Sequence, residues 1–274
     1  MAGQGRRRSV RAGAAMNLFD AELHPVPLRQ GDLDDLRFFG VTGALGAADD
    51  AASPATADGV RRAWDALAPG AVRRLRRAGI AGFAAVGVHP RRVPWRGLEA
   101  LLAELPEFLG RRHVAALGAI GLEEGGAREE EVFGRQLVLA RELRLPVVVH
   151  TPWRRKEALT RRALALLREH ELEPERVLVA RADARTVRMV RACGYAAGLS
   201  LSAGARDPLD EAARLVRALG PEGLVLGSGA GDGAGDLLAL PRAAHRLTRA
   251  GLSPAVVRRV CGENARRLLG LGEG

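Results

Sequence analysis

The sequence predicts an α/β fold of the (β/α)8 TIM-barrel class, in which eight parallel strands alternate with helices. Eight short apolar runs recur along the 274 residues, and a helical pattern follows each of them. Most runs are continuously apolar rather than alternating, as expected when helices cover the outside of a parallel sheet. An open, doubly wound sheet is the alternative, because the number of strands does not by itself establish closure.

Each element is expected at a defined place in the chain. The predicted strands are residues 16–21, 39–46, 81–88, 113–121, 145–150, 175–180, 195–202 and 223–228. The predicted helices are 32–38, 56–79, 96–109, 128–143, 156–171, 184–192, 208–218 and 236–250, with a last helix at 254–268. Asp207-Pro208 and Ser253-Pro254 each place a capping residue before a proline at the first helical position. Gly79, Gly110 and Gly194 mark helix ends.

The chain is expected to form one barrel domain over residues 16–274, preceded by a disordered basic tail over residues 1–15. That tail holds four arginines and no following apolar stretch, so a secretory signal is not expected. No apolar run approaches the roughly 20 residues of a membrane span, which favours a soluble protein without membrane association. Cys193 and Cys261 fit a reducing, cytoplasmic compartment without a disulfide framework.

The formal net charge of +10 invites a role in nucleic-acid binding, because arginine and lysine neutralise phosphates. Lys156 is the only lysine among 42 basic residues. Arginine pairs are scattered along the predicted helices without interleaved aromatic residues. This distribution favours a compositional bias and a solvated helical surface, and nucleic acid remains an alternative partner.

In a barrel of this class, functional side chains lie at the carboxyl ends of the strands. The segments found there carry several ordered motifs. They are Phe19-Asp20-Ala21-Glu22-Leu23-His24, Gly87-Val88-His89-Pro90-Arg91, Leu117-Gly118-Ala119-Ile120-Gly121-Leu122-Glu123 and His150-Thr151-Pro152, with Glu263-Asn264-Ala265-Arg266-Arg267-Leu268 near the end of the chain. In these motifs the chain resembles the TatD-type metal-dependent hydrolases of the amidohydrolase superfamily, over nearly everything from Phe19 to Leu269.

The resemblance implies a barrel holding one or two divalent metals that activate water. It also implies ligands at six positions: a His-x-His pair on strand one, a glutamate on strand four, histidines on strands five and six, and an aspartate on strand eight. This sequence has the following residues at those positions: Glu22, His24, Ala119, His150, Arg181 and Gly229. Three of them lack a ligand atom suited to a divalent cation. The Arg181 guanidinium is also permanently charged and would repel a metal ion.

Three hypotheses follow. The first is a pseudoenzyme, a barrel with a degenerate metal site that serves as a scaffold for a small anionic ligand or a protein partner. The second is an active hydrolase of phosphodiester, ester or amide bonds that uses Glu22, His24 and His150 for one zinc, iron or manganese ion, with Glu123 or Asp232 as a base. The third is a basic, nucleic-acid-associated protein. The resemblance leaves open whether any metal is bound.

Further candidate binding residues surround the predicted metal positions. Glycines after strand eight let backbone amides approach an anion, so Ser228, Gly229 and Asp232 are expected to join Arg181 in a ligand site. His89 either contributes to that pocket or fixes its own loop.

Two tryptophans follow the third and fifth strands. Trp95 and Trp153 could therefore stack on a ligand at the pocket mouth, or cap the barrel beneath a loop.

Overall fold

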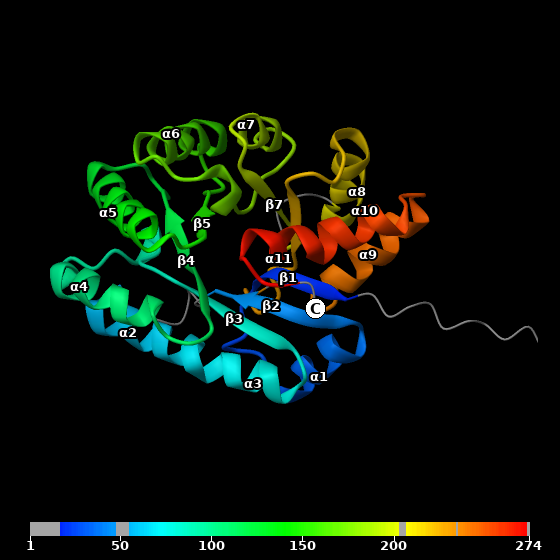
Figure 1. The fold of residues 1–274 in the computed structure, drawn as a ribbon, viewed down its shortest axis with the longest axis horizontal. Helices are drawn as coiled ribbons and strands as arrows, with labels where there is room; N and C mark the ends of the chain where they lie inside the picture. The colour runs from blue at the N-terminus through cyan, green and yellow to red at the C-terminus, as the bar shows by residue number, and fades with distance from the viewer. Residues whose placement is uncertain (1–16, 48–54, 203–206, 234, 273–274) are drawn as a thin grey trace, which may run out of the picture.

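The structure is a computed structural model that describes residues 17–47, 55–202, 207–233 and 235–272. Eight parallel strands lie in the order β1 to β8 in one sheet that curls into a barrel (Figure 1). The strands are β1 (Leu18–Leu23), β2 (Val41–Gly46), β3 (Ala81–Val86), β4 (Val114–Gly121), β5 (Val147–His150), β6 (Val177–Val179), β7 (Ala196–Ser200) and β8 (Leu224–Gly227). The predicted TIM barrel is confirmed. The predicted basic tail over residues 1–15 lies outside the described residues.

Helices follow the strands and cover the outside of the barrel (Figure 1). They are α1 (Gln30–Phe38), α2 (Ala57–Asp65), η1 (Ala66–Ala71), α3 (Val72–Arg77), η2 (Pro90–Arg92), α4 (Leu98–Leu109), α5 (Ala127–Leu143), α6 (Lys156–Glu169), η3 (Pro174–Arg176), α7 (Val187–Ala192), α8 (Pro208–Leu219), α9 (Ala239–Arg249), α10 (Pro254–Arg258), η4 (Arg259–Glu263) and α11 (Asn264–Leu268). The predicted caps are confirmed: the Asp207 carboxylate accepts the amides of Leu209 and Asp210, and the Ser253 hydroxyl accepts that of Val256.

Two predicted helices are less regular than the sequence pattern indicates. The single helix expected over 56–79 is interrupted at Ala68, whose backbone is extended with φ −124° and ψ 100°. The cause is Pro69, which has no amide hydrogen and disfavours a helical conformation in the residue before it. The helix expected over 254–268 contains a wider turn, η4, at Arg259–Glu263. An added Cβ on Gly262 would lie 2.9 Å from the Asn17 carbonyl oxygen, so glycine lets this turn pack directly against the start of β1.

Hydrogen bonds between the first and last strands join the two edges of the sheet. The Gly229 amide donates to the Glu22 carbonyl at 2.7 Å, and the His24 amide donates to the Ala230 carbonyl at 2.8 Å. The fully buried Asp20 carboxylate accepts the Ser228 amide at 2.9 Å. Burial raises the pKa of Asp20 to about 6, against the lowering effect of its hydrogen bonds with Ser228. Because these contacts join β1 to the end of β8, the alternative of an open, doubly wound sheet is wrong.

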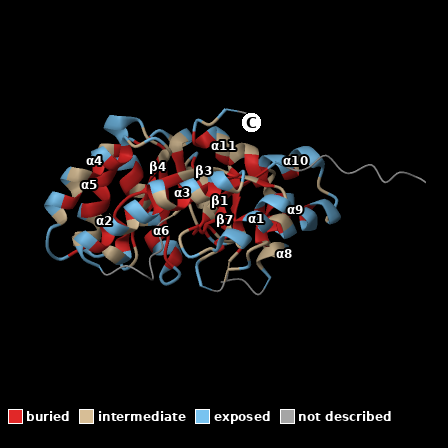
Figure 2. Ribbon diagram, turned by 90° about the horizontal axis from the view of Figure 1, so that it is seen from below, coloured by how far each residue is buried: buried red, intermediate tan, exposed pale blue. Residues whose placement is uncertain are grey.

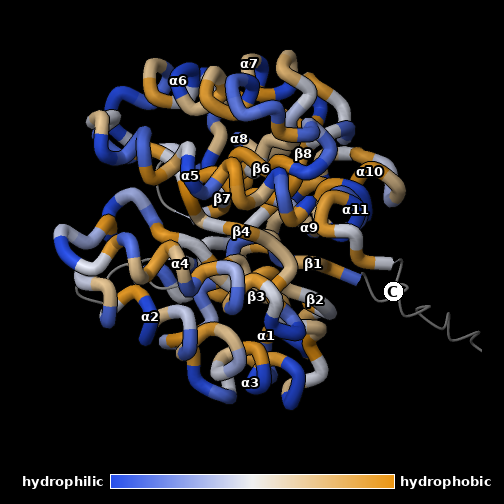
Figure 3. Tube along the Cα trace, turned by 60° about the vertical axis from the view of Figure 1, so that its left-hand side comes forward, coloured by the Kyte–Doolittle hydropathy of each residue, from blue (hydrophilic) through white to orange (hydrophobic). Residues whose placement is uncertain are grey.

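Apolar side chains form two clusters, one between the sheet and the helices and one inside the barrel. Figure 2 shows buried residues on the strands and on the inward faces of the helices. Figure 3 shows hydrophobic segments along the strands and hydrophilic ones along the outer helices. Inside the barrel, Phe19, Leu178 and Val225 fill the interior, and Leu268 of α11 packs against the same cluster. The cluster also contains Ala21 and Ala85, whose side chains are small and line a pocket.

Within the described residues, no helix has both the length and the apolar character required to cross a bilayer.

The Asp20 carboxylate is expected to stabilise the junction between β1 and β8. Replacing Asp20 with alanine leaves the amides of Ser228 and Glu22 without their acceptor, and each orphaned amide costs about 1–3 kcal/mol if it stays buried. We expect urea denaturation of Asp20→Ala to show a loss in unfolding free energy in that range or above. Asp34→Ala, which removes an exposed hydrogen bond to Gln30, is the control and should change stability by less than about 0.5 kcal/mol. Equal losses in the two variants would contradict the proposed role of Asp20.

Candidate ligand pocket at the barrel mouth

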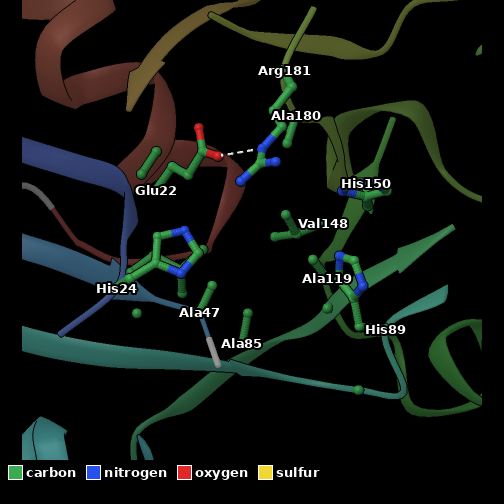
Figure 4. A pocket seen from close by; sticks show the side chains of 15 residues that line it. Glu22, His24, Ala47, Ala85, His89, Ala119, Val148, His150, Ala180 and Arg181 are labelled. Carbon is green, nitrogen blue, oxygen red and sulfur yellow. Dashed lines mark hydrogen bonds and ion pairs between the residues drawn. The ribbon is translucent and has the colours of Figure 1, made fainter. Parts of the chain in front are cut away.

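A pocket opens at the carboxyl ends of the strands, with an empty volume of about 610 Å³ that includes space open to solvent. Its floor and walls are largely small or apolar, and its polar side chains come from the ends of β1, β3, β5 and β6 (Figure 4). The lining residues are Ala21, Glu22, His24, Leu45, Gly46, Ala47, Ala85, Gly87, His89, Gly118, Ala119, Val148, His150, Ala180 and Arg181. Glu22, His24, His89, His150 and Arg181, all singled out from the sequence, therefore share one pocket.

Arg181 places a cation in this pocket. Its side chain is only 8% exposed, and its Nε donates to Glu22 Oε1 at 2.8 Å, the contact drawn as a dashed line in Figure 4. Its Nη2 donates to Asp232 Oδ2 at 3.0 Å. An arginine guanidinium is not deprotonated in proteins, so this cation is permanent. Glu22 and Asp232 are thus both engaged by Arg181.

The backbone of Arg181, two residues after the end of β6, adopts a left-handed conformation with φ 58°. Lys156, the first residue of α6, donates from Nζ to the Arg181 carbonyl and to Thr151 Oγ1 at 2.8 Å. The Thr151 hydroxyl in turn donates to the Ala180 carbonyl at 2.8 Å. Left-handed backbone costs energy in a residue with a Cβ, so the surrounding hydrogen bonds hold Arg181 in it. Lys156 was not among the site residues predicted from the sequence, although its being the only lysine was a usable signal.

His150 is held by a charged network at the edge of the pocket. Its Nε2 lies 2.7 Å from Glu123 Oε2, and Arg91 Nη2 donates to Glu123 Oε1 at 2.9 Å. Burial opposes ionisation of Glu123, but hydrogen bonds with His150 and Arg91 outweigh it and lower its pKa to about 2. Burial also lowers the pKa of His150, although Glu123 acts in the opposite direction. Glu123, predicted as one candidate base, is therefore a paired and weakly basic carboxylate.

His89 packs against His150 with the two ring centroids 4.5 Å apart and the rings 63° from parallel. Its Nδ1 accepts the Arg91 amide at 3.2 Å, so one of its ring nitrogens fixes its own loop. Burial, followed by the nearby His150, lowers the pKa of His89 well below its ordinary value. His89 consequently combines the two roles considered from the sequence: it orders the loop after β3 and lines the pocket.

His24 has unused hydrogen-bonding capacity. The residue is 5% exposed and lines the pocket, and neither ring nitrogen has a hydrogen-bond partner within the described residues. Buried polar atoms in folded proteins are nearly always bonded, if not to protein then to water or a ligand. His24 is therefore the side chain in this pocket that is best placed to bind an added molecule.

A metal centre does not fit the side chains as they are arranged. Among the described residues, no group of three or more His, Cys, Asp or Glu residues is close enough to hold a metal ion. Figure 4 shows Glu22 and His24 on one side of the pocket and His89 and His150 on the other, with Arg181 between them. Ala119, at the position of the implied glutamate, offers no ligand atom. Metal binding by Glu22, His24 and His150 thus stays a prediction.

The segment after β8 uses its amides within the barrel. Besides the Ser228 and Gly229 amides, which donate to β1, the Ala230 amide donates to Ser228 Oγ at 2.9 Å. Ser228, Gly229 and Asp232 do not line the pocket directly, although Asp232 reaches it through Arg181. Binding of an anion by this segment stays a prediction. Three of the backbone amides expected to bind the anion, those of Ser228, Gly229 and Ala230, already donate hydrogen bonds within the barrel.

Ser202 of the β7 end fills the space beside Gly229. A Cβ added to Gly229 would lie 2.5 Å from Ser202 Oγ and 2.6 Å from its Cβ, and Gly229 has φ 64°. Ser200 and Ser202 also share a hydrogen bond of 2.9 Å between their hydroxyl oxygens. No local sequence pattern indicates this contact, because the two residues come from different strand ends. An aspartate at position 229 would need both a strained backbone and a displaced Ser202.

The buried ammonium of Lys156 is expected to titrate unusually early. Burial is the main cause that lowers its pKa from 10.5 to about 8, and Asp183 opposes that shift. Protein labelled with ¹⁵N-lysine has one Nζ resonance, and its titration midpoint should lie near 8. Burial of the charged ammonium lowers the free energy of unfolding below about pH 8. Between about pH 8 and 10.5 the ammonium is deprotonated in the folded state but not in the unfolded state, so this loss is relieved as pH rises. Wild type should therefore gain stability relative to Lys156→Met over this interval. A midpoint near 10.5 would mean that the ammonium is solvated.

A known protein family and a known relative each match most of this chain. Residues 68–270, well over half of the chain, match the family model described as TatD related DNase. An uncharacterized metal-dependent hydrolase of Methanocaldococcus jannaschii is 29% identical over 225 residues, which cover 82% of this chain and 88% of that protein.

Solved structures share the barrel fold. The TatD-like protein from Archaeoglobus fulgidus superposes with a TM-score of 0.78 at 27% identity, covering 92% of this chain and 100% of that one. The phosphotriesterase homology protein from Escherichia coli, solved with phosphate in its active site, has a TM-score of 0.70 at 17% identity, covers 93% and 99% of the two chains, and supports the fold alone. Because the matched region covers well over half of the chain and includes β3 to β8, this chain belongs to the TatD related DNase family, a family of metal-dependent hydrolases.

Proposed function

We propose that this chain is a pseudoenzyme of the TatD family, a barrel that binds a ligand or partner at its mouth and does not perform metal-dependent hydrolysis. The observation that carries the proposal is the Arg181 guanidinium, buried in the pocket and bonded to both Glu22 and Asp232. A divalent ion in the same space would face a fixed positive charge and would compete with it for the Glu22 carboxylate.

Changes at two other positions support this proposal independently of charge. Ala119 supplies no carboxylate, and Gly229 is packed against Ser202 so closely that a side chain does not fit there. Ser202, beyond the end of β7, therefore fills the space around residue 229. The site has lost the room for a ligand side chain there as well as the side chain itself. The aspartate that the resemblance implies at position 229 as a metal ligand is therefore absent, and hydrolysis would also need a base.

One observation favours the active mononuclear hydrolase as a second candidate. His24 presents two ring nitrogens without partners within the described residues, and an imidazole nitrogen is a common ligand of zinc and iron. Glu22 and His150 would have to leave Arg181 and Glu123 to join it. This candidate therefore requires a rearrangement of two hydrogen-bonded pairs.

The metal content of the purified protein distinguishes the two candidates. Protein produced in medium supplemented with zinc, iron and manganese, and purified without chelator, should contain less than about 0.2 equivalents of any of these metals because Arg181 occupies the pocket. Inductively coupled plasma mass spectrometry measures this directly. Near-stoichiometric metal in protein that also hydrolyses a phosphodiester or an ester would favour the mononuclear enzyme instead.

Restoring the implied ligands is expected to succeed only if Ser202 is also changed. Ala119→Glu, Arg181→His and Gly229→Asp together should yield an unstable protein with little bound metal, because the new aspartate collides with Ser202. Adding Ser202→Gly removes the atoms at 2.5 and 2.6 Å and should allow about one equivalent of zinc to bind. Ser202→Gly alone is the matched control and should bind none. Equal zinc binding with and without Ser202→Gly would show that this contact does not limit the site.

A further inference from the structure

A second pocket lies at the amino end of the barrel, opposite the mouth. This amino-end pocket is lined by Asn17, directly before β1, and by residues between Arg258 and Gly272. Its empty volume is about 1280 Å³, which includes space open to solvent. Helix α11 packs beside β1 here (Figure 1). Catalysis in barrels of this class takes place at the carboxyl ends of the strands, so this end is suited to binding rather than to chemistry.

The charged side chains of the amino-end pocket carry an excess of positive charge. Arg258, Arg266 and Arg267 line it together with one acid, Glu263. Glu263 is engaged by Arg258, whose Nε lies 3.3 Å from Glu263 Oε1. Within the described residues, neither Arg266 nor Arg267 has a carboxylate within ion-pair distance. Two guanidinium groups beside this pocket therefore have no counter-ion in the part of the chain that the structure describes.

Arg266 is held in position without the help of an acid. Its guanidinium carbon lies 5.1 Å from the Phe19 ring centroid, and its Nη2 donates to Thr42 Oγ1 at 3.0 Å. A Cβ added to Gly43 would lie 3.2 Å from that Nη2, so the glycine leaves room for the guanidinium. The side chain is half-buried, and desolvation lowers its pKa. The hydrogens on its Nε and Nη1 have no acceptor within the described residues, so they are left for an acceptor that enters the pocket.

A half-buried cation without a counter-ion is unfavourable, because attraction to an opposite charge does not offset its desolvation. Arg181 at the mouth has such compensation, since the carboxylates of Glu22 and Asp232 both accept hydrogen bonds from it. Arg266 lacks carboxylate partners within the described residues, and it borders a pocket that is open to solvent. A bound anion would supply the missing charge and accept the unused hydrogens.

We propose that the amino-end pocket binds a phosphate group, with Arg266 as its main contact and Arg267 and Asn17 beside it. A phosphate dianion matches the two guanidinium charges, whereas a single carboxylate supplies only one negative charge. Arginine suits this role because its planar guanidinium donates several charge-assisted hydrogen bonds to phosphate oxygens. The Asn17 carboxamide lines the same pocket and can donate one more. This site goes beyond the function proposed for the mouth, because it lies at the other end of the barrel.

Isothermal titration calorimetry with sodium phosphate tests the proposal, at low ionic strength and on protein from which metal has been removed by chelation and dialysis. Wild type should show saturable binding below roughly 10 mM phosphate. Arg266→Gln should weaken the affinity by about 10- to 150-fold, because charge-assisted hydrogen bonds are lost. Arg267→Gln removes an exposed charge and should weaken it by about 2- to 5-fold. Glu263→Gln removes the acid of the pocket and should strengthen it by about 2- to 5-fold.

Arg188→Gln is the matched control for the change in charge. Arg188 is an exposed residue of α7 without a hydrogen bond or ion pair within the described residues. This variant should bind phosphate as wild type does. If Arg266→Gln does not fold, the opposite effects expected of Arg267→Gln and Glu263→Gln still decide the question.

Glycerol 3-phosphate, titrated under the same conditions, identifies the source of the phosphate group. Tighter binding than that of inorganic phosphate would indicate an organic phosphate ester, and equal or weaker binding would indicate free phosphate. Absence of saturable phosphate binding would overturn the proposal. Equal phosphate affinity in wild type, Arg266→Gln and Arg267→Gln would also overturn it, since the phosphate would then bind elsewhere. Tighter binding of acetate than of phosphate would overturn the assignment to a phosphate group.

Discussion

The guanidinium of Arg181 lies between the carboxylates of Glu22 and Asp232 at the mouth of the barrel, with 8% of its side chain exposed. A buried charge is tolerated when it is paired and hydrogen-bonded, and here two carboxylates and a fixed backbone provide both conditions. Removing the cation would leave the Glu22 carboxylate without its hydrogen-bond partner in a poorly solvated space, whereas removing Glu22 would leave Arg181 bonded to Asp232. The arrangement of the pocket thus follows from this ion pair: Glu22 is turned to Arg181, and His24 is left without a partner within the described residues.

The position of Arg181 depends in turn on features outside the pocket. Lys156 and Thr151 bond the carbonyls of Arg181 and Ala180, so the end of β6 is tied to the loop between β5 and α6. On the other side, Asp20 and the Gly229 amide join β8 to β1 and hold Glu22 at the barrel edge. Hydrogen-bonded segments of the barrel therefore hold both the Glu22 carboxylate and the Arg181 guanidinium in place. Precise placement of a buried charged pair requires such support, because small displacements expose each charge to desolvation without compensation.

The barrel mouth combines features that favour binding with features that disfavour the chemistry of its family. Small side chains such as Ala21 and Ala119 leave space above the packed interior. Two imidazoles with lowered pKa values, His89 and His150, are uncharged near neutral pH and so add no charge to the pocket. The exposed indole of Trp95 lies outside this space and does not cap the barrel beneath a loop, which was one of the two roles considered from the sequence. A barrel scaffold can keep its fold while its loops change role, because strand and helix packing is largely independent of the residues at the strand ends.

The sequence alone predicted the barrel and the polar side chains that line the pocket, although it also placed Ser228 and Gly229 there, which do not line it. Continuous apolar runs such as Val147–His150 located the strands, and local caps such as Asp207 located helix starts, because these signals act between neighbouring residues. Since parallel strands end at one edge, the sequence predicts that His24, His150 and Arg181 lie together. The break at Pro69 is also encoded locally, but the apolar periodicity on both sides of it predicts one continuous helix.

Tertiary structure alone decided which of these side chains bond to one another. Glu22 meets Arg181 across 159 residues, and Ser202 fills the space beside Gly229 from another strand end. Lys156 reaches the Arg181 carbonyl from the first turn of a helix. Such pairings depend on strand register, barrel closure and side-chain rotamers together, and no short stretch of sequence encodes all three.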